Sequence, residues 1–254
     1  MKTRRPGAQR ARRPRGVVPL ERALSKLGLA SRADARALIS AGRVNVDGVT
    51  VTNPLHPVVP ERIRVTLDGA RRRRAARRVL ALHKPRGVVT TRRDPEGRPT
   101  VFDLLGDAGR GLIAVGRLDL ASTGLLIFTN DTQLAHRLTD PARRVPRLYV
   151  VTVRGCVSEG ERLQVRGGLD VPGPNDVPER LSVDEVEIRK ASARETHLVV
   201  TLLEGRNREI RRLFDAIGHE VTRLHRIAYG RLQLGTLTPG AYRDVTDDDI
   251  EPEH

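Results

Sequence analysis

The sequence predicts an α+β protein in two parts: a small module of two helices and strands, followed by a larger part built on a mixed, largely antiparallel β-sheet with flanking helices. Apolar residues with helical spacing occur twice before residue 43. After residue 79 most apolar runs are strand-like, and helices do not separate them regularly, which argues against a doubly wound parallel sheet. Two arginine-rich segments, 1–16 and 69–78, flank the small module.

Two helices are predicted in the small module, which we place at residues 18–68. Apolar residues over 20–27 follow the i, i+3, i+4, i+7 spacing of one helix face, and Gly28 provides a stop. Ser31 is a favourable N-cap for a second helix, which Gly42 ends. Each helix carries one apolar face, as helices that pack on a core do.

A hairpin and a further strand follow the second helix. Asp47-Gly48 stands between alternating residues in VNVDGVTV, and this dipeptide is a strong signal for a two-residue turn. Residues 62–67 add a strand. A module of about 50 residues is only marginally stable alone. Segment 69–78 is then an arginine-rich linker to the larger part, which we place at 79–247.

The larger part contains runs with strand character at 79–84, 112–115, 124–129, 148–153, 186–190, 197–203 and 231–235. Asn130-Asp131 is expected to cap a helix that runs through Leu138. A second helix is predicted within 207–218, where an i, i+3, i+4, i+7 apolar stripe ends at Gly218. Segment 171–179, VPGPNDVPE, is predicted to be a loop.

The positive charge is concentrated in two short segments. The chain carries 46 Lys and Arg against 31 Asp and Glu, for a net charge of +15. Segments 1–16 and 69–78 hold 13 of these basic residues and no acid, which leaves 33 basic against 31 acidic residues elsewhere. Such runs suit the phosphates of a nucleic acid; solvated tails that serve solubility are the alternative. We expect 1–17 to be a disordered basic tail and 248–254 an acidic C-terminal tail.

Several classes of protein are disfavoured by motifs that the sequence lacks. It has no run of about 18 apolar residues and no signal-peptide core, and no P-loop, dinucleotide fingerprint or nucleophile elbow. Its one cysteine, Cys156, excludes an intrachain disulfide and is expected to be a packing residue. His219 and His225 have a weak spacing for metal ligands. We therefore expect a cytoplasmic protein that uses no membrane, metal or cofactor.

Three polar stretches remain as candidates for chemistry. Arg117 and Asp119 precede the apolar run GLLIF. Arg147 and Tyr149 begin an alternating strand, and EGRNREIRRLF, 204–214, leads into a helix with several arginines. Taken separately, they are explained at least as well by a surface ion pair, a strand-edge tyrosine and a solvated helix face.

Four segments resemble, in order, the signature of the RsuA/RluB-type pseudouridine synthases. They are HKPRGVVTTRRDPEGRPTVFDLL, VGRLDLASTGLLIFTND, PRLYVV and EGRNREIRRLFDAIGHEVTRLHRIAYGRLQLGTLTPGAYRDVT. The small module resembles the RNA-binding module that this family shares with a small-subunit ribosomal protein. The resemblance covers roughly residues 18–246. The first segment is most similar to the RluB branch, which acts on large-subunit rRNA.

The resemblance implies a pseudouridine synthase fold and the isomerisation of uridine to pseudouridine within RNA, without a cofactor. Asp119 matches the essential aspartate, which either attacks the anomeric carbon or takes a proton from the adjacent ribose carbon; the sequence leaves both roles open. Arg211 matches the basic residue that pairs with the aspartate, Tyr149 the tyrosine that packs on the target base, and Leu213 an apolar lining residue. Arg117 would help to hold the flipped nucleotide.

The resemblance also implies a set of RNA-contacting residues, namely Ser31, Arg32, Arg36, Arg43, Lys84, Arg147, Arg206 and Asn207. The implied partner is 23S rRNA, and the chain is expected to act as a monomer. The alternative is a non-catalytic rRNA-binding ribosome-assembly factor, which would bind RNA without isomerising uridine.

Overall fold

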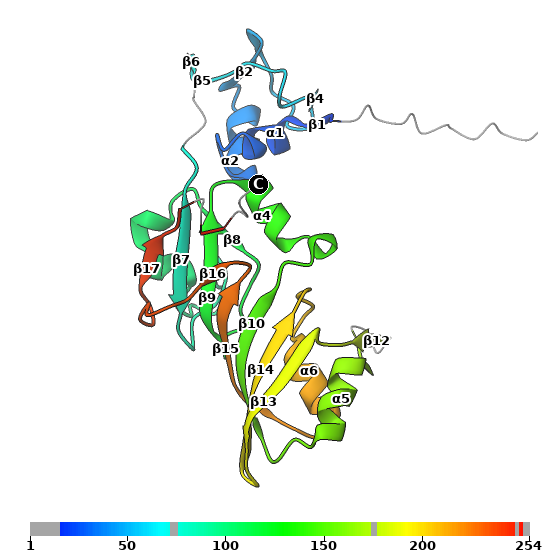
Figure 1. Ribbon diagram of the computed structural model, residues 1–254. Coiled ribbons are helices and arrows are strands. Elements are labelled where there is room, and N and C mark those ends of the chain that lie inside the picture. The colour runs from blue at the N-terminus through cyan, green and yellow to red at the C-terminus, as the bar shows by residue number, and fades with distance from the viewer. Residues whose placement is uncertain (1–15, 72–75, 174–176, 247–248, 251–254) are drawn as a thin grey trace, which may run out of the picture. The chain divides into compact units, whose positions relative to one another are not determined.

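The chain divides into two compact units, Met1–Ala76 and Arg77–His254. The computed structural model describes residues 16–71, 76–173, 177–246 and 249–250 (Figure 1). Nearly all of the expected basic tail, 1–17, lies outside the described residues, as do residues 72–75 of the expected linker.

The first unit contains the two predicted helices, α1 (Leu20–Lys26) and α2 (Arg32–Ser40). The Ser31 hydroxyl caps α2 by accepting a hydrogen bond from the backbone N–H of Asp34 at 3.1 Å. Leu20, Leu24 and Ile39 are fully buried, so the apolar faces of both helices form the core of this unit.

A small antiparallel sheet completes the first unit, in the order β3-β2-β5-β6. Its strands are β2 (Val44–Val46), β3 (Val49–Thr50), β5 (Val65–Leu67) and β6 (Ala70–Arg71), and β1 (Val18–Pro19) pairs separately with β4 (Pro57–Val58). Asp47 and Gly48 both have positive φ, +50° and +89°, as a type I′ hairpin turn requires. Because β6 pairs with β5, Ala70 and Arg71 belong to the sheet of the first unit, whereas they were expected to belong to the linker 69–78.

The second unit is built on a nine-stranded sheet with the main order β13-β14-β10-β15-β9-β7-β17, while β16 pairs with β15 and β8 with β9 (Figure 1). The strands are β7 (Val79–Lys84), β8 (Ile113–Val115), β9 (Thr123–Thr129), β10 (Arg147–Arg154), β13 (Glu185–Ala191), β14 (Glu195–Leu202), β15 (Val221–Tyr229), β16 (Leu232–Gln233) and β17 (Tyr242–Asp244). Every pairing is antiparallel except β9 with β15. The predicted α+β class with a mixed, largely antiparallel sheet is confirmed.

The parallel pairing of β9 with β15 depends on a glycine. Gly124 lies opposite Arg226 and has φ of +107°. A Cβ atom at position 124 would lie 2.2 Å from the carbonyl oxygen of Arg226, closer than any real contact. Only glycine therefore allows the two strands to approach at this point, which immediately follows the loop that carries Asp119.

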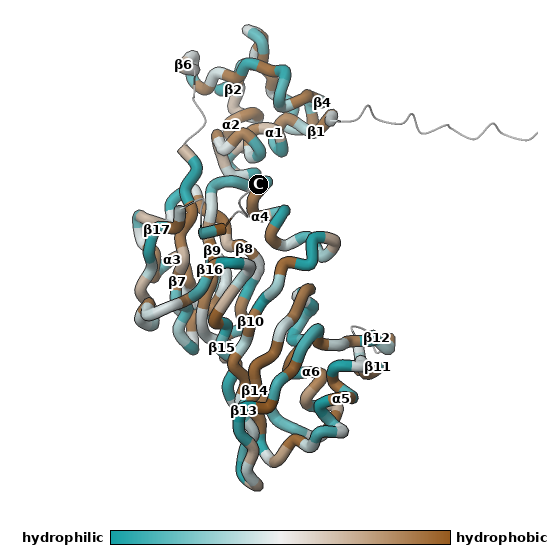
Figure 2. Tube along the Cα trace, viewed as in Figure 1, coloured by the Kyte–Doolittle hydropathy of each residue, from teal (hydrophilic) through white to brown (hydrophobic). Residues whose placement is uncertain are grey.

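Helices pack against this sheet: α3 (Val101–Leu105), α4 (Thr132–Thr139), α5 (Glu159–Gly167) and α6 (Glu209–Ala216), with 3₁₀ turns η1 (Gly106–Gly109) and η2 (Pro141–Arg143). Asp131 caps α4 as predicted, by accepting from two backbone N–H groups. Helices α3 and α5 were not predicted from the sequence, although each begins with a reciprocal capping box. Hydrophobic residues follow the central strands of the sheet (Figure 2). No helix among the described residues is long and apolar enough to cross a membrane.

Three local predictions for the second unit are corrected. The predicted loop 171–179 contains parts of an antiparallel hairpin formed by β11 (Leu169–Pro172) and β12 (Pro178–Leu181). The expected acidic tail, 248–254, is described only at Asp249 and Ile250. Ile250 is 8% exposed and packs in the hydrophobic core, so this part of the tail is packed. Cys156 is exposed and is not a packing residue.

Candidate active site

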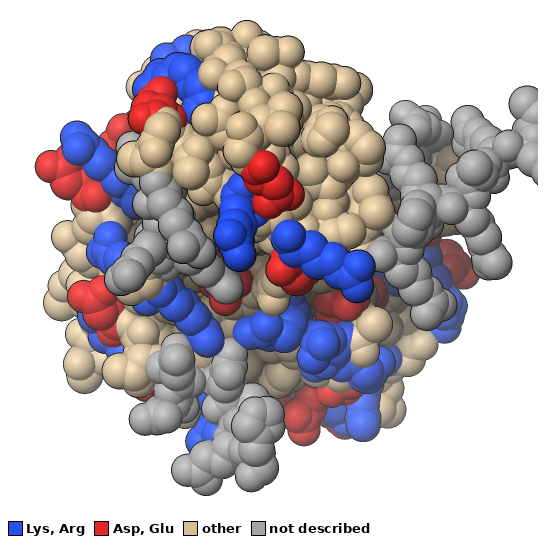
Figure 3. Space-filling view, turned by 90° about the horizontal axis from the view of Figure 1, so that it is seen from above, with Lys and Arg blue, Asp and Glu red and all other residues tan. Residues whose placement is uncertain are grey.

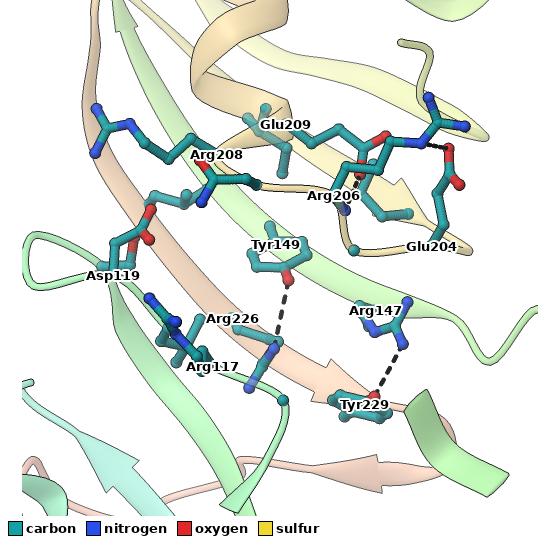
Figure 4. Close-up of a pocket in the computed structure, with 18 of the residues that line it drawn as sticks. Arg117, Asp119, Arg147, Tyr149, Glu204, Arg206, Arg208, Glu209, Arg226 and Tyr229 are labelled. Atoms are coloured by element: carbon teal, nitrogen blue, oxygen red, sulfur yellow. Dashed lines mark hydrogen bonds and ion pairs between the residues drawn. The ribbon is translucent and has the colours of Figure 1, made fainter. Parts of the chain in front are cut away.

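A cavity of about 530 Å³ opens on the second unit where strands β10 and β15 meet two loops (Figure 4). One loop is 116–122, between β8 and β9, and the other is 203–208, between β14 and α6. Six of the sequence-predicted residues line this cavity: Arg117, Asp119, Arg147, Tyr149, Arg206 and Asn207. Residues 30 to 90 positions apart in the chain are thus brought together.

The loop that carries Asp119 is anchored through its carbonyl groups. Thr90 Oγ1 donates to the carbonyl of Leu118 at 2.8 Å, and the N–H of Gly87 donates to that of Leu120 at 2.9 Å. A turn closes between Asp119 and Ser122, whose N–H donates to the Asp119 carbonyl at 3.0 Å. Residues of segment 83–91 therefore hold the loop backbone in place. This segment lies at the start of the first segment that resembles the family.

Lys84 provides a further anchor for the same loop. Its Nζ donates to the carbonyls of Ser122 at 2.8 Å and Pro85 at 3.0 Å. The side chain is 0% exposed, and this burial lowers the pKa of Lys84 to about 8, although the negative charge of Asp119 acts in the opposite direction. The expectation that Lys84 contacts RNA is corrected, because strand β7 is buried along its whole length.

The Asp119 carboxylate takes part in no hydrogen bond or ion pair with the described residues. The sequence analysis considered an ion pair with Arg117, and Arg211 was expected to pair with the aspartate. Instead, Arg117 is exposed at the cavity, and Arg211 donates to the carbonyls of Val221 at 2.8 Å and Ala121 at 3.5 Å. Burial and the charges of Arg208 and Arg86 hold the pKa of Arg211 below its ordinary value, and the charge of Asp119 partly opposes them. Arg211 therefore influences Asp119 in two ways: its positive charge attracts the carboxylate, and its hydrogen bond to the Ala121 carbonyl holds the loop that carries Asp119.

Tyr149 and Arg226 form the floor of the cavity between the two loops (Figure 4). Tyr149 is 7% exposed on β10, opposite Arg226 on β15. Arg226 Nη1 donates to the Tyr149 hydroxyl at 3.5 Å, and its Nε donates to the carbonyl of Leu125 at 2.7 Å. The same arginine thereby connects the floor to strand β9.

A β-bulge determines which side chains reach this floor. The pairing of β10 with β15 shifts between Leu148 and Tyr149, so that Ile227 has no partner in the ladder. Arg226 and Tyr229 are three residues apart and would face opposite sides of a regular strand; the bulge turns both toward the cavity.

Loop 203–208 forms the opposite wall. Arg208 has φ of +49°, a left-handed conformation that is uncommon for a residue other than glycine, and it is the N-cap of α6. The Glu209 carboxylate accepts from the backbone N–H of Arg206 at 3.1 Å and so closes the loop onto the helix. Burial, reinforced by the negative charge of Glu204, raises the pKa of Glu209 to about 7. The Arg206 guanidinium bonds Glu204 at 3.0 Å and Glu179 at 3.3 Å.

Leu213 does not line the cavity. It is fully buried in the core, and Ile210, one turn earlier on α6, is the lining residue. The cavity is also lined by Arg226 and Tyr229, which were not expected at the site and whose one signal was their position in the last resembling segment. Arg208 and Glu209 line it as well, and both lie in the candidate polar stretch 204–214.

The residues expected to bind RNA in the first unit have mixed surroundings. Arg32 is exposed, and Ser31 uses its hydroxyl to cap α2. Arg36 pairs with Glu21 at 2.8 Å and Arg43 with Asp68 at 2.7 Å, and both arginines remain exposed. Lys and Arg side chains lie among Asp and Glu on the face shown in Figure 3. Among the described residues, no three His, Cys, Asp or Glu side chains form a group that could hold a metal.

Comparisons with known proteins show which family the chain belongs to. A family model described as RNA pseudouridylate synthase matches residues 78–216, and one described as S4 domain matches residues 18–62. A solved structure described as a pseudouridylate synthase has a TM-score of 0.66 and 26% identity over 92% of this chain and 98% of its own. The chain therefore belongs to the RNA pseudouridylate synthase family, whose members are isomerases that act on RNA.

Curated relatives extend over most of the chain. An RNA pseudouridine synthase of Mycobacterium bovis, itself described as uncharacterised, is 41% identical over 95% of this chain and 94% of its own length. The ribosomal large subunit pseudouridine synthase B of Salmonella typhi is 41% identical over 85% of this chain and 74% of its own. The protein of the same name from Pseudomonas aeruginosa is 42% identical over 91% of this chain but only 60% of its own length.

Proposed function

We propose that this chain converts a uridine of large-subunit rRNA to pseudouridine, with Asp119 as the catalytic residue. One observation carries the proposal: Asp119 lines an arginine-rich cavity on an anchored loop, and its carboxylate forms no bond with the described residues. The names of the relatives from Salmonella typhi and Pseudomonas aeruginosa support the large-subunit substrate. The S4 domain supplies a second RNA-binding surface.

The chemistry required of the site is an isomerisation. The bond from N1 of uracil to C1′ of ribose breaks, the base turns, and a bond from C5 to C1′ forms, while the hydrogen of C5 leaves and N1 gains one. Asp119 serves this reaction as an ionised carboxylate, either by attack on C1′ or by removal of the proton on C2′. Arg211 lies near enough to Asp119 for their opposite charges to attract each other.

The remaining residues position the substrate. A uridine in folded RNA must leave its stack to reach Asp119. Tyr149 offers an aromatic side chain at the floor of the cavity, and stacking on such a ring contributes about 1–3 kcal/mol per base. Arg117, Arg206 and Asn207 line the cavity and are suited to hold the RNA backbone around the flipped nucleotide. The described lining residues all belong to the second unit, so the cavity is built without the first unit, which suits action as a monomer. An rRNA substrate suits a cytoplasmic location.

Mapping of pseudouridines in rRNA tests this proposal. Ribosomal RNA from the source strain is compared with rRNA from a strain that lacks the protein, and from that strain complemented with wild type or with Asp119→Asn. We expect one or a few 23S pseudouridines to disappear and to return only with wild type. An unchanged 23S pattern would refute the large-subunit assignment. Restoration by Asp119→Asn would refute the catalytic role and would favour an rRNA-binding assembly factor.

A further inference from the structure

Two buried arginines stand at the end of the cavity formed by β10 and β15. Arg147 is 5% exposed and Arg226 is 2% exposed, and both line the cavity. Their guanidinium carbons lie 4.9 Å and 5.1 Å from the centre of the Tyr229 ring, so that both cations contact the same aromatic side chain (Figure 4). The Tyr229 hydroxyl is itself fixed, because it donates to the Leu138 carbonyl at 2.8 Å.

Neither guanidinium has an acidic partner among the described residues. Arg147 Nη2 donates to the Leu138 carbonyl at 3.2 Å and to the Tyr229 hydroxyl at 2.9 Å, and Arg226 donates only to the Leu125 carbonyl and the Tyr149 hydroxyl. All of these acceptors are neutral. A buried cation without a counterion is costly, because burial removes its hydration and no opposite charge compensates for it.

Each arginine also keeps one buried nitrogen that bonds no described atom. These are Nη1 of Arg147 and Nη2 of Arg226. Loop 203–208 packs against the first of them: a Cβ atom at Gly205 would rest 3.6 Å from Arg147 Nη1, at ordinary contact distance. Gly205 has no positive φ that would require glycine, so a longer side chain at this position would press directly on the guanidinium.

We propose that Arg147 and Arg226 form a built anion site that binds one phosphodiester of the RNA strand beside the flipped nucleotide. This inference rests on the proposed function, since it takes RNA as the ligand of the cavity. A phosphodiester carries one negative charge on two nonbridging oxygens, which suits two guanidinium groups that each offer a free N–H. The anion supplies the counterion that the protein does not. The site fixes the position of the strand and reads no base.

Salt-dependent binding of a single-stranded oligouridine RNA to the full-length protein tests the site. Loss of one phosphate contact reduces the slope of log K against log salt by about 0.7 for single strands. We expect Arg147→Gln and Arg226→Gln each to weaken binding by about ten-fold or more and to reduce the slope by this amount. The double variant should lose one contact, not two. Arg110→Gln, which removes an exposed arginine paired with Asp107 at 2.9 Å, should keep the wild-type slope.

Modified RNA separates a lost contact from a damaged fold. One neutral methylphosphonate linkage, moved along the oligouridine, should weaken binding to wild type at one position and have no effect there on Arg226→Gln. Gly205→Leu, which keeps both charges but adds a bulky side chain against Arg147 Nη1, should weaken binding as well. Wild-type slopes in both arginine variants, or a methylphosphonate effect that persists in Arg226→Gln, would overturn the proposal. The assay measures binding alone, so absence of pseudouridine formation would refute the proposed function and leave this site standing.

Discussion

Replacement of Lys84 by methionine should change how the stability of the protein depends on pH. Lys84 is fully buried, and its pKa lies at about 8 in place of the ordinary 10.5. Between these two values the unfolded chain binds the proton and the folded chain does not, so the stability of wild type rises with pH. The difference in pKa corresponds to ~3 kcal/mol, which wild type should gain relative to Lys84→Met between pH 7 and pH 10.5.

Urea denaturation of the two proteins at several pH values measures this difference. Other groups titrate alike in both, so the difference in unfolding free energy isolates Lys84. Lys190→Met, at an exposed position on β13, is the control and should show no such trend. A difference between wild type and Lys84→Met that stays constant with pH would refute the reasoning. Lys84→Met should also reduce kcat more than it raises KM, because the Asp119 loop loses the anchor at Ser122.

Three further substitutions test the supports of the site. Gly124→Ala should lower the unfolding free energy by more than about 3 kcal/mol, because its Cβ meets the Arg226 backbone; an unchanged urea midpoint would contradict this. Thr90→Val should cost about 1–2 kcal/mol and reduce kcat by loosening Leu118, and kinetics identical to wild type would argue against the anchor. Glu209 has a pKa raised from 4.5 to about 7, so its stabilising effect is full below pH 4.5 and lost as pH rises through 7. Relative to Glu209→Gln, wild type should lose ~3 kcal/mol over that range in denaturation experiments, and a pH-independent difference would count against the assignment.

Hydrophobic patterning predicted most of the sheet and the clearest helices. Strand β7 was predicted with its observed bounds, because VLALHK is buried on both faces and reads as a continuous apolar run. The stripe of α6 was equally readable, since Ile210, Leu213 and Phe214 are all buried. The hairpin Asp47-Gly48 followed from local turn chemistry alone. Each of these features is determined by residues that are close together in the chain, so a local sequence pattern is enough to predict it.

The details of the site depend on contacts between distant strands, which no local pattern contains. The bulge at Ile227 turns Arg226 and Tyr229 to one face, and strand periodicity would place them on opposite faces. Lys84 was expected to contact RNA because of the family resemblance, whereas the carbonyl of Ser122 gives it a buried partner that no local pattern predicts. The hairpin β11–β12 was missed because its prolines and glycines resemble a loop.

The role of Asp119 in the chemistry can be separated from RNA binding in a single-turnover experiment. Purified wild type and Asp119→Asn are incubated in excess over an RNA fragment that carries the mapped uridine, and pseudouridine formation and RNA binding are measured on the same samples. We expect Asp119→Asn to bind the fragment with wild-type affinity and to form no pseudouridine. Pseudouridine formation by Asp119→Asn at the wild-type rate would contradict it.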